Sequence, residues 1–206
     1  MTAAPVLRAG AWPTVAGLSG AAAVPGGGAA AFPAAATVLL PVCFALLTAA
    51  SAFTLDEPAS PVVDVTPTGP VHRAMIRSVA LLAPLTVGAL VILAAAWRGA
   101  ALPWAATGLA LFGNVVLGFT AACVARTWSG EPGPAAGTAV ALILMAPGLA
   151  PSLVPQAAHW VHTLPAPGAD GPSSDTVWWT VLAACPVTLA VAAHGRRLPR
   201  HVPRDP

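Results

Sequence analysis

The side chains that could perform chemistry are few in this sequence, and the first candidates are a serine and a histidine near opposite ends of the chain. Gly17 to Gly20 spell Gly-Leu-Ser-Gly, and His194 lies 12 residues before the C-terminus. A nucleophilic serine requires a base within hydrogen-bond distance, so a hydrolase would need Ser19 and His194 to meet in space. Short glycine-serine matches are common in a chain rich in alanine and glycine. We therefore expect no catalytic residue.

Metal and redox chemistry also have few candidate residues. His159 and His162 are three residues apart, which would place both on one face of a helix, but only Asp170 or Asp175 could supply a third ligand nearby. The cysteines form no CxxC pair and fall in separate apolar stretches, at Cys43, Cys123 and Cys185. Such thiols usually pack as small apolar groups. We predict no metal site and no cofactor in this chain.

The most informative polar stretch covers residues 55–77, LDEPASPVVDVTPTGPVHRAMIR. Ser60 is suited to an N-cap, Pro61 to the first helical position, and Pro67 would end the helix after one or two turns. We interpret the stretch as a coupling loop that contacts a soluble partner through Asp56, Glu57, Ser60, Asp64, His72, Arg73 and Arg77. The alternative is that proline and charge simply solvate a turn and anchor a membrane helix.

The elements around this loop are predicted to be membrane helices. The chain is 57% hydrophobic and 8% charged, whereas soluble domains carry roughly 25% charged residues. The fold class is therefore an all-α integral membrane protein with about six spans, over residues 9–25, 34–54, 78–97, 103–125, 135–155 and 176–193. A helix needs roughly 20 apolar residues to cross the hydrocarbon core.

The first predicted span is the least regular, because it is short and is followed by Pro-Gly-Gly-Gly at residues 25–28. It is open to interpretation as a sixth helix, an interfacial segment or a signal peptide. In the second and third cases five spans would remain. The central span from Ser78 to Trp97 carries no charge at all, and a single charge at its centre would cost about 2.5 to 3.5 kcal/mol.

The distribution of arginine predicts the orientation. All nine basic residues are arginine, and with six spans only Arg98 lies apart from the other eight. Because cytoplasmic loops collect arginine and lysine, both termini, the coupling loop and the tail at residues 195–206 are predicted to be cytoplasmic. The segment at residues 156–175 would be an external excursion. A net charge of +2 without a basic stripe excludes a nucleic-acid groove.

The spans contain little that could move an ion. Their interiors lack ionisable residues, which are typical of ion-coupled transporters. Asn114 is the most polar side chain within a span. It is expected either to hydrogen-bond between helices or to line a substrate path.

This architecture resembles the membrane subunits of type-2 ABC exporters, particularly small actinobacterial forms encoded beside an ATPase subunit. Those proteins have six helices, cytoplasmic ends, a coupling helix between helices two and three, and an outer excursion between helices five and six. The chain matches by position at residues 56–77 and 156–175. It lacks the clear amphipathic N-terminal elbow helix of larger members and carries no invariant motif.

The resemblance implies a permease subunit in the bacterial plasma membrane that exports a peptide, antibiotic or other amphipathic compound. Its partners would be an ABC ATPase subunit, which binds ATP and Mg, and a second permease subunit, identical or different. The chain itself has no GxxxxGK[ST] sequence. The alternative function is a non-transporting membrane scaffold or immunity protein that binds a partner.

Overall fold

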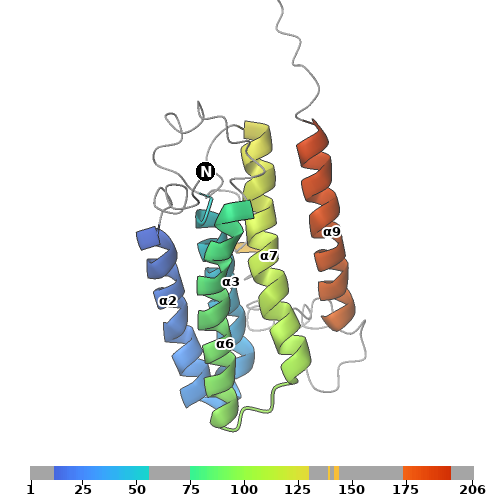
Figure 1. Ribbon diagram of the computed structural model, residues 1–206. Helices are drawn as coiled ribbons and strands as arrows, with labels where there is room; N and C mark the ends of the chain where they lie inside the picture. Colours follow the sequence, from blue (N-terminus) through green and yellow to red (C-terminus); the bar gives the residue numbers. More distant parts are fainter. Residues whose placement is uncertain (1–11, 56–74, 130–138, 140–141, 144–173, 196–206) are drawn as a thin grey trace, which may run out of the picture.

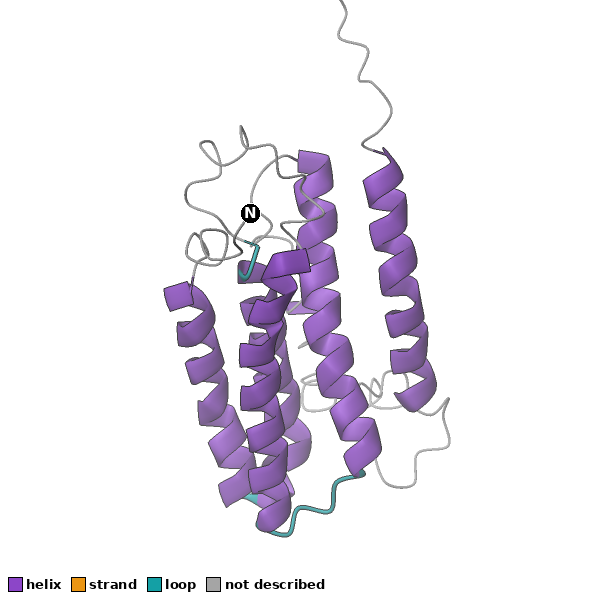
Figure 2. Ribbon diagram, in the orientation of Figure 1, coloured by secondary structure: helices purple, strands orange, loops and turns teal. Residues whose placement is uncertain are grey.

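The computed structural model describes residues 12–55, 75–129, 139, 142–143 and 174–195. Its long helices in these ranges are α2 (Trp12–Ala31), α3 (Ala36–Phe53), α6 (Leu82–Trp97), α7 (Trp104–Ser129) and α9 (Ser174–Gly195) (Figure 1). Two 3-10 turns, η1 (Pro33–Ala35) and η2 (Val79–Leu81), lead into α3 and α6. The described part is helices joined by short loops, without a strand (Figure 2).

The helices form a bundle in which α2, α3, α6 and α7 alternate in direction, whereas α9 runs the same way as α7 (Figure 1). One end, here called the Arg77 end, therefore holds the start of α2, the end of α3, the helical turn before α6, and the ends of α7 and α9. The opposite end, the Trp97 end, holds the end of α6 and the starts of α7 and α9. Within the bundle α2 packs on α3 and α6, and α7 packs on α3 and α9.

Among the described residues, three helical stretches are long and apolar enough to cross a membrane: Pro33–Phe53, Met75–Trp97 and Trp104–Ala125. They indicate a membrane protein and lie within three residues of the predicted spans at 34–54, 78–97 and 103–125. A shorter apolar helix covers Thr176–Val191, inside the last predicted span. The span predicted at 135–155 lies largely outside the described residues, so the count of six stays a prediction.

The first helix differs from its predicted form, because α2 continues through Pro25 and the glycines at residues 26–28 to Ala31. Its buried residues recur every three or four positions, at Val15, Ser19, Ala22, Gly26 and Ala29. A Cβ added at Gly26 would lie 2.8 Å from Val91 Cγ1, so glycine allows α2 to approach α6 closely. This packing maintains the helix where local propensity would end it. α2 is not one of the three apolar stretches above.

A tight turn and exposed tryptophans mark the Trp97 end. Gly99 has φ +84°, and the amides of Gly99 and Ala100 donate to the carbonyls of Ala96 and Ala95, which closes α6 in a Schellman motif. Three helices each place an exposed tryptophan at this end: Trp97 on α6, Trp104 on α7 and Trp179 on α9. Amphipathic indole rings at one level are typical of a membrane–water interface.

Candidate functional site

The structure describes two of the eight residues proposed as functional, Arg77 and Asn114. The other six lie outside the described part of the chain: Asp56, Glu57, Ser60, Asp64, His72 and Arg73. The predicted coupling helix lies outside it as well. His159 and His162 also fall outside it. The described part of the candidate site consists of the helix ends next to residues 56–74 and the contacts between α3 and α7 further along the bundle.

Arg77 connects the two helical segments on either side of residues 56–74. Its side chain is only 3% exposed, and Nη1 donates a hydrogen bond to the carbonyl oxygen of Leu55, 3.1 Å away. The last carbonyls of a helix have no partner within the helix and carry a partial negative charge. The Arg77 guanidinium is therefore favourable just beyond the end of α3. Its hydrogen bond holds the start of the Met75–Trp97 helix against α3.

A small apolar cluster lies at the same end of the bundle. Leu55, Ala52, Phe119 and Ala122 are buried in it, and Leu81 packs against it from η2. The cluster joins the end of α3, the beginning of α6 and the last third of α7. The helical segments on both sides of residues 56–74 therefore pack against the same part of α7.

Asn114 lies in the contact between α3 and α7, where it is 5% exposed. Its Nδ2 donates to the carbonyl of Ala110 at 2.8 Å, and its Oδ1 lies 3.3 Å from the hydroxyl of Thr48 on α3. The Thr48 hydroxyl also lies 2.8 Å from the carbonyl of Phe44. The Thr48 hydroxyl has one proton, so the Phe44 carbonyl oxygen and Asn114 Oδ1 share it in a three-centre hydrogen bond. This amide is engaged in helix packing.

Gly118, one turn after Asn114, sets the distance between the same two helices. A Cβ at this position would lie 2.5 Å from the Ser51 hydroxyl oxygen and 2.8 Å from Thr48 Cγ2, and closer still to the Thr48 carbonyl oxygen. Only glycine permits this approach. This contact was not predicted from the sequence, although the Asn-x-x-x-Gly spacing on one helix face is a signal that could have indicated it.

Glycines also bring α7 against its other neighbours. A Cβ at Gly113 would lie 3.0 Å from Trp178 Cζ3, so the indole of α9 rests on α7 at that position. A Cβ at Gly88 of α6 would lie 2.7 Å from Leu111 Cδ2 of α7. α7 is therefore the helix on which α3, α6 and α9 converge.

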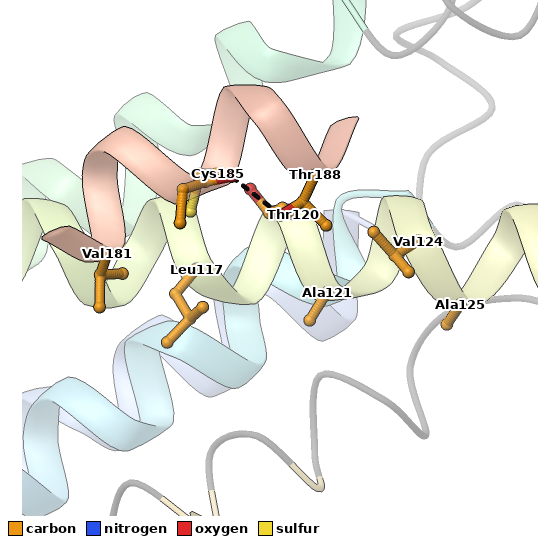
Figure 3. Close-up of a pocket in the computed structure, with 9 residues that line it drawn as sticks. Leu117, Thr120, Ala121, Val124, Ala125, Val181, Cys185 and Thr188 are labelled. Carbon is orange, nitrogen blue, oxygen red and sulfur yellow. Dashed lines mark hydrogen bonds between the residues drawn. The ribbon is translucent and has the colours of Figure 1, made fainter. Parts of the chain in front are cut away.

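Beyond the Trp178 contact, α7 and α9 border an apolar groove of about 440 Å³. Its lining from α7 is Leu117, Thr120, Ala121, Val124 and Ala125, and its lining from α9 is Val181, Ala184, Cys185 and Thr188 (Figure 3). None of these residues is charged. The groove was not predicted from the sequence, because both helices are apolar on several faces and the sequence contains no sign of which faces meet.

The serine and histidine considered for hydrolysis are on helices with different neighbours. Ser19 is buried in α2, which packs on α3 and α6, whereas His194 belongs to α9, which packs on α7. In Figure 1 the other helices stand between α2 and α9. In the described part of the chain, the helices that carry Ser19 and His194 are therefore not packed against each other, as a hydrolase using this pair would require. No family model, no curated protein and no solved structure matches the chain.

Proposed function

We propose that this chain is the membrane-spanning permease subunit of an ATP-driven exporter of the type-2 ABC class. Its cargo would be a peptide, an antibiotic or another amphipathic compound, and a second permease subunit would complete the transport unit. The observation that carries the proposal is the contact of Arg77 with the Leu55 carbonyl, because it makes the two borders of the coupling loop one mechanical unit.

The absence of ionisable side chains from the span interiors favours an external source of energy. Pro33–Phe53 and Trp104–Ala125 contain no acidic or basic residue, and in Met75–Trp97 the only one is Arg77, the third residue of that stretch. Ion-coupled transporters usually place such residues at membrane depth. In the proposed complex ATP and Mg are bound by the partner ATPase.

The proposed mechanism begins with closure of the ATPase partner against residues 55–77. Because Arg77 joins α6 to the end of α3, a push on the loop would move both helices together. The Asn114 and Gly118 contacts would pass that movement to α7, and the apolar groove beside α9 would open or close to cargo. Rigid-body shifts of packed helices are an established form of such coupling.

The proposal is tested by co-expression with the ATPase subunit encoded beside this chain. The two should co-purify, and combined charge reversal of Asp56, Glu57 and Asp64 should abolish substrate-stimulated ATPase activity in the complex. Arg77→Ala should reduce it, whereas Arg98→Ala, an arginine change at the opposite end, should leave it unchanged.

Full stimulation in the charge-reversed complex would refute the coupling role of the loop. Failure to recover any ATPase subunit in a stoichiometric complex would refute the permease function itself. That second outcome would support the membrane scaffold or immunity protein instead.

A further inference from the structure

α2 differs from α3, α6 and α7 because it is not apolar enough to be a candidate membrane span by composition. Trp12–Ala31 contains no charged residue, but most of it is alanine and glycine, which contribute little hydropathy. Its 20 residues would extend about 30 Å at a rise of ~1.5 Å per residue. The hydrocarbon core of a bilayer is also roughly 30 Å thick. The length of α2 therefore permits a crossing that its hydropathy does not favour.

The buried side of α2 nevertheless belongs to the main apolar core of the bundle. Ala22 and Ala29 are fully buried in the cluster that also contains Leu40 of α3 and Val91 of α6. α2 runs beside α3 and α6 from the Arg77 end to the Trp97 end (Figure 1). Both neighbours belong to stretches that are long and apolar enough to cross a membrane. A helix packed along both of them shares their depth in that membrane.

Two glycines in the last third of α2 bring it close to these neighbours. A Cβ at Gly26 would lie 2.8 Å from Val91 Cγ1, and a Cβ at Gly28 would lie 3.0 Å from Leu39 Cδ1. Gly27 lies between them on the exposed side, where a Cβ would meet nothing within 4 Å. Helices in lipid associate through close van der Waals packing of this kind, because lipid chains are as apolar as the helices themselves.

We infer that α2 crosses the membrane because it packs against α3 and α6, and not because of its own hydropathy. A change that separates α2 from α6 should therefore release α2 from the bilayer and leave α6 across it. Val24 reports the two states, since its side chain is 76% exposed. It contacts lipid when α2 crosses and water when α2 is released. The inference does not rest on the proposed function.

The test compares Gly26→Val with Gly27→Val in the full chain, reconstituted in sealed lipid vesicles. Both changes raise the hydropathy of α2 equally, but only a side chain at position 26 meets Val91. The native cysteines are replaced by alanine, and Val24→Cys is exposed to a membrane-impermeant maleimide present on both sides of the membrane. We expect no labelling in the parent background or in Gly27→Val. In Gly26→Val, labelling should be as complete as in vesicles dissolved with sodium dodecyl sulfate.

A second variant distinguishes loss of the α2 contact from other effects of Gly26→Val. Val91→Ala removes most of the side chain that the new valine would meet, so the combination of Gly26→Val with Val91→Ala should shield Val24→Cys again. Leu93→Cys is the control for the rest of the bundle, because Leu93 is exposed on α6 within a candidate span. It should stay unlabelled in every variant.

Each result decides one part of the inference. Labelling of Val24→Cys in the parent background would show that α2 does not cross. Shielding of Val24→Cys in Gly26→Val, or continued labelling after Val91→Ala is added, would refute the dependence on packing against α6. Labelling of Leu93→Cys in Gly26→Val would refute the separate release of α2, because α6 would then have left the bilayer as well.

Discussion

Gly118→Ala is the smallest change that tests how α3 and α7 are held together. The added methyl would overlap the Thr48 carbonyl oxygen and lie 2.5 Å from the Ser51 hydroxyl oxygen. A backbone carbonyl cannot turn away as the end of a long side chain can. The two helices must therefore separate locally, which also lengthens the bond between Thr48 and Asn114, already 3.3 Å.

The expected loss of stability follows from three contributions. Overpacking costs about 1 to 3 kcal/mol, and the clash with backbone argues for the upper half of that range. Weakening the interhelical hydrogen bond adds about 0.6 kcal/mol. Replacing glycine by alanine within a helix returns about 0.8 to 1 kcal/mol. The net effect of Gly118→Ala should be destabilisation by about 2 kcal/mol.

Gly108→Ala provides the control on the same helix. A Cβ at Gly108 would meet nothing within 4 Å, so only the gain in helix propensity applies and stability should be equal or higher by up to about 1 kcal/mol. Reversible unfolding by sodium dodecyl sulfate in mixed micelles, followed by tryptophan fluorescence, measures both variants. If Gly118→Ala were as stable as Gly108→Ala, the close α3–α7 contact would be refuted.

Two further predictions concern the same bundle. In a double-mutant cycle, Thr48→Val and Asn114→Leu should show a coupling energy of about 0.6 kcal/mol; fully additive unfolding free energies would refute the three-centre bond. With the native cysteines replaced, exposed Met75→Cys and Ala101→Cys should react with a membrane-impermeant maleimide from opposite sides of the membrane, because Met75 begins a candidate span and Ala101 follows its end at Trp97. Labelling of both from one side of sealed vesicles would contradict a crossing by Met75–Trp97.

The sequence predicts the three apolar stretches well because the absence of charge over 20 residues is a property of the chain itself. Their boundaries agree within three residues with those of the structure. The continuation of α2 beyond Pro25 could not be predicted in the same way. It depends on Gly26 resting against Val91, and these residues are brought together only by the bundle.

The candidate site was predicted unevenly for the same reason. Arg77 and Asn114 stand out because a charged or amide group is rare in an apolar stretch. Thr120 does not stand out, because most threonines in these helices satisfy their hydroxyl locally, and only the structure identifies one that does not. Glycine spacing was a signal within the sequence, but it does not identify the partner helix.

The two faces of α7 meet their neighbours at different distances. Toward α3 it presents Asn114 and Gly118, which allow contact at backbone distance and leave no space for a ligand. Toward α9 it presents Leu117 and Thr120, beside a groove of about 440 Å³. An added group on the first face should therefore lower the unfolding free energy more than a group of equal volume added on the second. Since positions 117 and 118 are adjacent, their variants differ in face while sharing helix, depth and local sequence.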